Sequence, residues 1–335
     1  MLYAKLFLVL IISFFASLVL SPLLISLIKR EKVNQVILHY VESHKQKSGT
    51  PTMGGIIFIV SICLVSLLFF DKQSMLLGTM CLVMFVAYGI VGFLDDFIKF
   101  KFRRNLGLRA YQKIIFQLAI AIFISVFAFK NNFVGSSLIL PFSKRTIDFG
   151  YFIIPLNILV ILAITNSVNL TDGLDGLATG TTLSYFATTA ILLLVLFGGA
   201  FAGQSEVFTN QLSNIYIVVF SCVGALLCYL LFNCFPAKIF MGDTGSLALG
   251  ALVGAVAIFT KTTLYLPIIG IMFVLSSVSV IMQVAYYKIT KKRIFLMAPL
   301  HHHFEKKGMH EVRISVMYSV ITLLVGIVVV LIELA

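Results

Sequence analysis

Five aspartates lie at or beside the ends of apolar segments of this 335-residue chain, and they are the residues best suited to chemistry. Asp95 and Asp96 are adjacent in GFLDDFIKF, Asp172 and Asp175 lie in NLTDGLDG, and Asp243 lies in FMGDTGS. Neighbouring carboxylates repel one another unless a cation or a proton lies with them. Carboxylate oxygens are the ligands that Mg²⁺ prefers, and Mg²⁺ commonly completes its shell with phosphate oxygens and water. The pattern therefore favours phosphoryl transfer on a phosphorylated substrate, with Mg²⁺ as cofactor.

The NLTDGLDG segment allows two local conformations. The i, i+3, i+6 spacing of Asn169, Asp172 and Asp175 would place them along one face of a helix. Gly173 and Gly176 would instead permit a backbone turn that presents polar groups to a ligand.

Each acidic motif also has a purely structural interpretation. Adjacent helical residues point about 100° apart, so Asp95 and Asp96 could simply form a solvated helix end. NLTDGLDG could be a polar connection before the next apolar segment. Asp243 could be the N-cap of the helix that follows it.

Three consecutive histidines, His301, His302 and His303, occur in APLHHHFEKKG. A solvated loop, a metal site and a phosphate-binding site are the three alternatives. Consecutive side chains rarely converge on one ion, so hydrogen bonding to anions is favoured over metal ligation.

Composition predicts an all-α polytopic membrane protein that forms a single integral membrane domain over residues 1–335. The chain is 60% hydrophobic and 11% charged, with a mean hydropathy of +1.07. A bilayer core about 30 Å thick needs roughly 20 apolar residues per helix. On that basis we expect ten transmembrane helices, near residues 4–28, 53–70, 75–94, 113–130, 152–168, 179–198, 213–232, 247–260, 265–286 and 314–333. A small hairpin is expected between residues 136 and 150, where short β-prone pieces flank a polar turn.

Basic residues predict the orientation of these helices. Most of the 25 lysines and arginines fall in loops that follow odd-numbered spans, which makes that side cytoplasmic by the positive-inside rule. Both termini then lie outside, the hairpin is periplasmic, and the five aspartates and all six histidines face the cytoplasm. The chain has no Walker loop, kinase glycine-rich motif or nucleophile elbow, so ATP hydrolysis and acyl transfer have no support.

Five motifs together resemble the phospho-N-acetylmuramoyl-pentapeptide transferase family. These motifs are SGTPTMGG (48–55), GFLDDFIK (92–99), NLTDGLDGLA (169–178), FMGDTGSLALG (240–250) and APLHHHFEKKG (298–308). The paired aspartates, NxxDxxD and GDxGS also occur across the wider superfamily of polyprenyl-phosphate N-acetylhexosamine-1-phosphate transferases. TPTMGG and PLHHHFE are similar to the muramoyl-pentapeptide branch in particular.

The resemblance implies a Mg²⁺-dependent enzyme of the bacterial cytoplasmic membrane. Such an enzyme moves phospho-N-acetylmuramoyl-pentapeptide from UDP-MurNAc-pentapeptide onto undecaprenyl phosphate, giving UMP and lipid I for peptidoglycan. It also implies an active-site cleft on the cytoplasmic face, a homodimer surrounded by bilayer lipids, and no nucleic-acid partner. The resemblance leaves open whether the lipid phosphate attacks directly or an aspartate first forms a covalent phospho-sugar intermediate.

The resemblance also implies roles for individual residues. Asp243 is expected to bind Mg²⁺, and the residues expected at the reacting phosphates are Asp95, Asp96, Asp172, Asp243 and His302. The residues expected to bind substrate are Lys47, Lys113, Asn169, Gly173, Leu174, Asp175, Asn233, Phe240, His301 and His303, with Phe240 stacked on the uracil.

Two other functions compete with this one. An N-acetylglucosamine-1-phosphate transferase of the same superfamily is disfavoured by the two loop motifs. A cation transporter is the alternative of another class, because polar groups among membrane spans can mark an ion path. The carboxylates lie at span ends on one face, however, and no span carries a midplane Asp or Glu.

Overall fold

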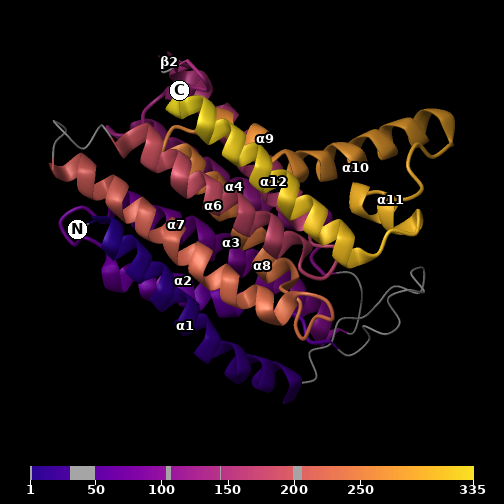
Figure 1. Ribbon diagram of the computed structural model, residues 1–335. Coiled ribbons are helices and arrows are strands. Elements are labelled where there is room, and N and C mark those ends of the chain that lie inside the picture. Colours follow the sequence, from indigo (N-terminus) through magenta and orange to yellow (C-terminus); the bar gives the residue numbers. More distant parts are fainter. Residues whose placement is uncertain (1, 31–49, 103–106, 144, 199–205) are drawn as a thin grey trace.

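Apolar helices dominate the computed structural model, which describes residues 2–30, 50–102, 107–143, 145–198 and 206–335 (Figure 1). Within these ranges, nine helices are long and apolar enough to cross a membrane. They are α1 (Leu2–Arg30), α3 (Leu76–Lys101), α4 (Ala110–Lys130), α5 (Ile153–Thr171), α6 (Leu177–Gly198), α7 (Glu206–Asn233), α8 (Gly242–Phe259), α10 (Ile271–Thr290) and α12 (Glu311–Leu334). A further apolar helix, α2 (Gly55–Phe69), has 15 residues, which gives about 22 Å, less than the thickness of a hydrocarbon core. The prediction of an all-α polytopic membrane protein is confirmed.

The prediction of one continuous span at 265–286 is wrong. A 3₁₀ turn, η3 (Thr263–Tyr265), leads into the short helix α9 (Leu266–Ile269), and α10 begins after Gly270. Helix α9 packs against α12, whereas α10 leaves the bundle at an angle (Figure 1). Apolar composition continues through both pieces, so it gave no sign of the break. Beyond α10, the histidine motif forms the short helix α11 (Leu300–Lys306).

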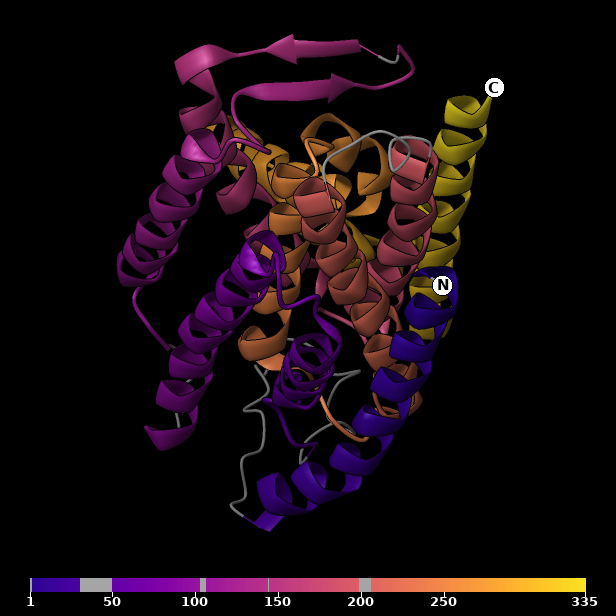
Figure 2. The same cartoon turned by 90° about the vertical axis from the view of Figure 1, so that its left-hand side faces the viewer.

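The predicted hairpin is confirmed. Strands β1 (Ser137–Leu140) and β2 (Arg145–Asp148) pair antiparallel, and a 3₁₀ turn, η2 (Gly150–Phe152), leads from them into α5. The hairpin lies across one end of the bundle (Figure 2). The buried carboxylate of Glu333 accepts hydrogen bonds from the Phe142 amide (2.7 Å) and the Tyr265 hydroxyl (2.6 Å). The first bond attaches the turn of the hairpin to the end of α12, and the second attaches η3 to the same carboxylate.

Helix α8 lies at the centre of the bundle. It packs against α3, α5 and α2, and every residue from Thr244 to Phe259 is buried. Its sequence, GDTGSLALGALVGAVAIF, is rich in glycine and alanine, which let neighbouring helices approach closely. On α3, Gly92 faces the backbone of Asp243 so closely that a Cβ there would overlap the Asp243 carbonyl. This close crossing brings the last turns of α3 against the first turn of α8, at the end of the bundle opposite the hairpin.

Candidate active site

The close crossing of α3 and α8 brings three of the five predicted aspartates together. Asp95 and Asp96 lie near the end of α3, and Asp243 lies in the first turn of α8. One carboxylate oxygen from each lies within 4.8 Å of the others. In the part of the chain that the structure describes, no other group of three or more Asp, Glu, His or Cys side chains is so arranged. We call Asp95, Asp96 and Asp243 the acidic cluster.

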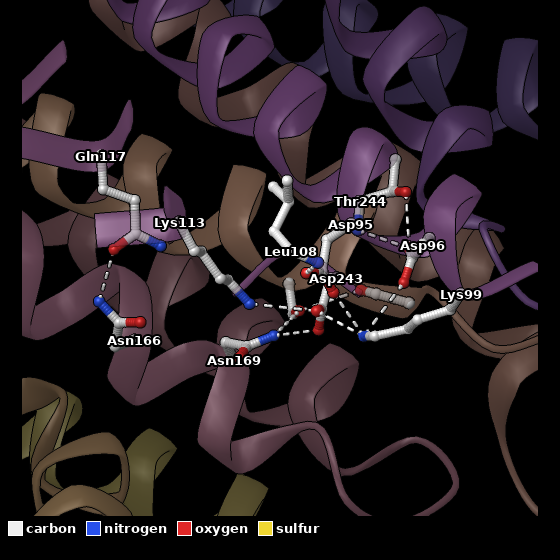
Figure 3. Close-up of polar contacts among 12 residues, drawn as sticks. Asp95, Asp96, Lys99, Leu108, Lys113, Gln117, Asn166, Asn169, Asp243 and Thr244 are labelled. Atoms are coloured by element: carbon white, nitrogen blue, oxygen red, sulfur yellow. Dashed lines mark hydrogen bonds and ion pairs between the residues drawn. The ribbon is translucent and has the colours of Figure 1, made fainter. Parts of the chain in front are cut away.

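Asp243 is the most heavily contacted member of the acidic cluster (Figure 3). Its Oδ1 accepts a hydrogen bond from Nδ2 of Asn169 (2.6 Å), and its Oδ2 accepts from the Nζ atoms of Lys99 (2.8 Å) and Lys113 (3.1 Å). The N-cap of α8 is Met241, whose own side chain makes no capping hydrogen bond, so Asp243 is not the N-cap of its helix. The carboxylate of Asp243 points to polar side chains of three other helices instead, as a functional group would.

Among the described residues, the other two carboxylates, unlike that of Asp243, accept hydrogen bonds from backbone amides. Oδ2 of Asp96 accepts from the amide (2.9 Å) and the hydroxyl (2.7 Å) of Thr244, so Asp96 caps the first turn of α8 from outside the helix. Oδ1 of Asp95 accepts from the amide of Leu108 (2.8 Å), in the connection between α3 and α4. Both side chains are buried, and these bonds fix the positions of the elements around Asp243.

Lys99 lies in the site although no role was predicted for it. Its Nζ lies 2.6 Å from Oδ2 of Asp95, 2.8 Å from Oδ2 of Asp243 and 3.8 Å from Oδ1 of Asp96. It lies four residues after Asp95 and three after Asp96, and side chains at these spacings share a helix face. That spacing was a usable signal for placing Lys99 in the site.

Of the two conformations that the NLTDGLDG segment allowed, the structure has the turn, and Asn169, Asp172 and Asp175 do not share one helical face. Helix α5 ends at Thr171, and α6 begins at Leu177. Gly176 has φ +71°, a conformation open to glycine and strained for other residues. Asn169 consequently remains on α5 beside Asp243, whereas Asp172 and Asp175 lie in the turn.

The two aspartates of the turn have different surroundings. Burial raises the pKa of Asp172 well above its usual value, and the nearby carboxylates of Asp243, Asp96 and Asp175 raise it further. Asp172 therefore takes up a proton more readily than a solvated aspartate. Oδ2 of Asp175 accepts from the Ala237 amide (2.9 Å), which ties the turn to the connection between α7 and α8.

Two residues expected to bind substrate, Leu174 and Asn233, make contacts within the protein. Leu174 is buried in an apolar cluster that includes Ile314 and Tyr318. Asn233 is buried, donates to the Ile239 carbonyl (2.9 Å) and accepts from Thr179 (2.6 Å). These contacts place both side chains in the interior of the protein.

Phe240 and Lys47 were also expected to bind substrate. Phe240 is partly exposed, and its amide and carbonyl pair with Pro51 and Gly54. These two backbone hydrogen bonds hold in place the segment that carries its ring. Lys47 lies outside the described residues.

The three histidines of α11 point in different directions, as expected for consecutive residues. His301 is fully buried against Gly173, where a Cβ would overlap its Nε2, and neither of its ring nitrogens has a hydrogen-bond partner among the described residues. His302 contacts Glu305 through Nδ1 (2.9 Å). His303 accepts from the Leu296 amide through Nδ1 (3.1 Å). They do not form a three-histidine metal site.

Burial, together with the adjacent His302, lowers the pKa of His301 to about 3. The unfolded chain then binds a proton between about pH 6.5 and pH 3 that the folded protein does not bind, so stability should fall as the pH falls through this range. At pH 5 the loss from this residue should be about 2 kcal/mol relative to pH 7. We expect His301→Gln to show a smaller drop in thermal midpoint between pH 7 and pH 5 than the unmodified protein. Equal drops in the two proteins would contradict the buried neutral state.

The acidic cluster fits a divalent cation of the Mg²⁺ type. Its donors are hard carboxylate oxygens, at separations that one ion can bridge. Asp243 offers the ligand that is least committed to backbone. The neighbouring lysines add positive charge suited to phosphate groups.

The fold and the site together define a polytopic membrane protein with an acidic, lysine-flanked centre at one end of its bundle.

The model of the family described as glycosyl transferase family 4 matches residues 76–261, and the signature described as phospho-N-acetylmuramoyl-pentapeptide-transferase signature 1 matches residues 47–59. Curated proteins named phospho-N-acetylmuramoyl-pentapeptide-transferase are similar over nearly the whole chain. The protein of Clostridium kluyveri is 44% identical, over 95% of this chain and 96% of its own. Those of a Thermoanaerobacter species and Clostridioides difficile are 42% and 40% identical, over 96% and 94% of each chain. The chain belongs to the phospho-N-acetylmuramoyl-pentapeptide-transferase family.

Proposed function

We infer that the protein transfers phospho-N-acetylmuramoyl-pentapeptide from UDP-MurNAc-pentapeptide to undecaprenyl phosphate, giving UMP and lipid I for peptidoglycan synthesis. The observation that carries this proposal is the acidic cluster, flanked by Lys99 and Lys113, in a chain of this family. The protein lies in the bacterial cytoplasmic membrane with this cluster facing the cytoplasm, where a nucleotide-linked donor is made. The concentration of basic residues in the same loops supports that orientation.

The chain's own residues divide the work of positioning the two substrates. Asp243, supported by Asp95 and Asp96, would hold Mg²⁺. When bound, Mg²⁺ neutralises charge on the diphosphate and on the UMP leaving group. Lys113, already 3.1 Å from Asp243, places an ammonium group where a phosphate would approach. Nδ2 of Asn169 donates to Oδ1 of Asp243 and also to the hydroxyl of Ser246 on α8 (2.8 Å). These two bonds hold Asn169 in place, so the Asp243 carboxylate cannot rotate freely.

The lipid phosphate needs little help from a base. The second pKa of a phosphate monoester is about 6, so it is largely dianionic at pH 7. Asp95 already binds Leu108 and Lys99 through its two oxygens, which suits an electrostatic and positioning role. Direct in-line attack by the lipid phosphate on the sugar-linked phosphorus is the step that these contacts support.

Asp95→Asn tests the role of this residue. We expect kcat to fall by a similar factor at every pH between about 5 and 8, because the variant loses charge and position rather than a base. The measurement is a pH–rate profile of both proteins at saturating substrate. Recovery of the variant's rate above the phosphate pKa would contradict this assignment and favour a base.

The donor selectivity of the purified protein tests the proposed function. UMP release would be measured in detergent with undecaprenyl phosphate and either UDP-MurNAc-pentapeptide or UDP-N-acetylglucosamine, each with Mg²⁺ or EDTA. We expect Mg²⁺-dependent release from the muramoyl donor alone. Release from the glucosamine donor alone would move the protein to the sister branch, and release from neither would refute the transferase proposal.

A further inference from the structure

The ammonium group of Lys99 occupies the centre of the acidic cluster. Its Nζ lies within 3.8 Å of all three carboxylates and within 2.8 Å of two of them. Lys113 approaches Asp243 from the other side and contacts no other member of the cluster among the described residues (Figure 3). The two lysines therefore differ, because only Lys99 bridges the carboxylates.

A divalent cation and the Lys99 ammonium need the same oxygens. Mg²⁺ binds carboxylate oxygens at about 2.1 Å, and the three oxygens of the cluster lie within 4.8 Å of one another. An ion that binds there would lie where Lys99 Nζ now forms its short contacts with Asp95 and Asp243. Two positive groups cannot share these oxygens at contact distance without strong repulsion.

The charges of the site favour an exchange once an anionic substrate is present. Three carboxylates with Lys99 and Lys113 leave about one negative charge, which attracts a free cation only weakly. A diphosphate adds negative charge beside the cluster and offers new acceptors for an ammonium group. Lys99 has a flexible four-carbon stem, so its ammonium can move to a phosphate while the backbone of α3 stays in place.

The geometry points to Lys99 as a positioning residue. In the metal-free protein its ammonium group neutralises the acidic cluster, and when the cation binds this group moves to the substrate diphosphate. This rests on the proposed function and deepens it. The cation and the nucleotide diphosphate then bind with positive coupling. The cation releases the Lys99 ammonium group for the diphosphate, and the diphosphate offers that group new acceptors when the cation displaces it. Free divalent cations bind poorly to the protein alone.

Mn²⁺ binding to the purified full-length protein tests this role without turnover. Free Mn²⁺ would be followed by electron paramagnetic resonance, with and without UDP as the diphosphate probe. We expect UDP to tighten Mn²⁺ binding to the unmodified protein by about tenfold or more, within the usual range of coupling. We expect Lys99→Met to bind Mn²⁺ alone about tenfold more tightly than the unmodified protein, and UDP to add little.

Two matched variants separate this role from general effects of charge or folding. Lys101→Met removes the same charge from an exposed position two residues further along α3, and should behave as the unmodified protein does. Lys99→Arg keeps the charge, and should bind Mn²⁺ alone as weakly as the unmodified protein. The proposal is overturned if Lys99→Met binds Mn²⁺ alone no more tightly, or keeps the full coupling, or if Lys99→Arg or Lys101→Met matches Lys99→Met. Absence of Mn²⁺ binding to the unmodified protein even with UDP would overturn this proposal, whereas the proposed function stands or falls separately on Mg²⁺-dependent UMP release.

Discussion

Replacing Asp243 with asparagine is expected to lower kcat by about 10²- to 10³-fold, the usual loss when one group that stabilises transition-state charge is removed. Asparagine has nearly the same shape, so the helix should remain in place. The variant loses the negative charge that contacts Lys99 and Lys113, and an amide is a poor ligand for Mg²⁺. Steady-state UMP release, measured over a range of Mg²⁺ concentrations, gives the effect, and added Mg²⁺ should not restore the rate.

The control for this variant is Asp148→Asn. Asp148 is exposed on β2, at the opposite end of the bundle, and its replacement removes the same charge. Its rate should equal that of the unmodified protein. A loss below tenfold for Asp243→Asn would contradict the central place of this carboxylate.

Gly92→Ala is expected to cost about 1–3 kcal/mol of stability, the range for overpacking a filled interior, and to lower the rate by about 10²-fold. The added Cβ would overlap the Asp243 carbonyl and lie 2.6 Å from the Thr244 amide nitrogen. Both are backbone atoms at the start of α8, so the helix itself must move. That movement takes Asp243 away from Asp95 and Asp96. Thermal unfolding and UMP release, measured on the same detergent preparation, give the two effects.

Gly89→Ala provides the matched control on the same helix, almost one turn earlier. The closest atom to its Cβ would be the end of the Ile59 side chain at 3.0 Å, which can rotate, and Ala248 Cβ and the Thr244 carbonyl oxygen would lie at ordinary contact distances of 3.6 and 3.8 Å. Alanine also favours the helix by up to about 1 kcal/mol over glycine. This variant should keep its stability and its activity. Equal behaviour of the two variants would show that the close crossing of α3 and α8 does not position the site.

The sequence was most informative about which segments are apolar, because twenty-residue helices are required to cross a bilayer. It was least informative where backbone geometry depends on tertiary packing. The break between α9 and α10 lies within continuous apolar composition, at a place where α9 packs against α12. The end of α5 at Thr171 was one of two conformations that the glycines of NLTDGLDG allowed.

The chemistry of the site was predicted better than its contacts. The types and positions of the aspartates indicated an oxygen-liganded cation, and Asp95, Asp96 and Asp243 do converge. The capping of α8 by Asp96 could not be predicted, because it requires the crossing of two helices separated by more than a hundred residues. Asn233 was expected at the substrate, but its contacts join α7 to its own C-terminal loop and to α6.

The identity of the released nucleotide tests the central claim most directly. Transfer of a phospho-sugar breaks the bond between the two donor phosphates and releases UMP, whereas transfer of the sugar alone breaks the sugar–oxygen bond and releases UDP. Chromatography of the nucleotides formed from UDP-MurNAc-pentapeptide and undecaprenyl phosphate distinguishes the two reactions. We predict one UMP for each lipid-linked product. UDP as the product would show that the acidic cluster serves glycosyl transfer and would contradict the mechanism.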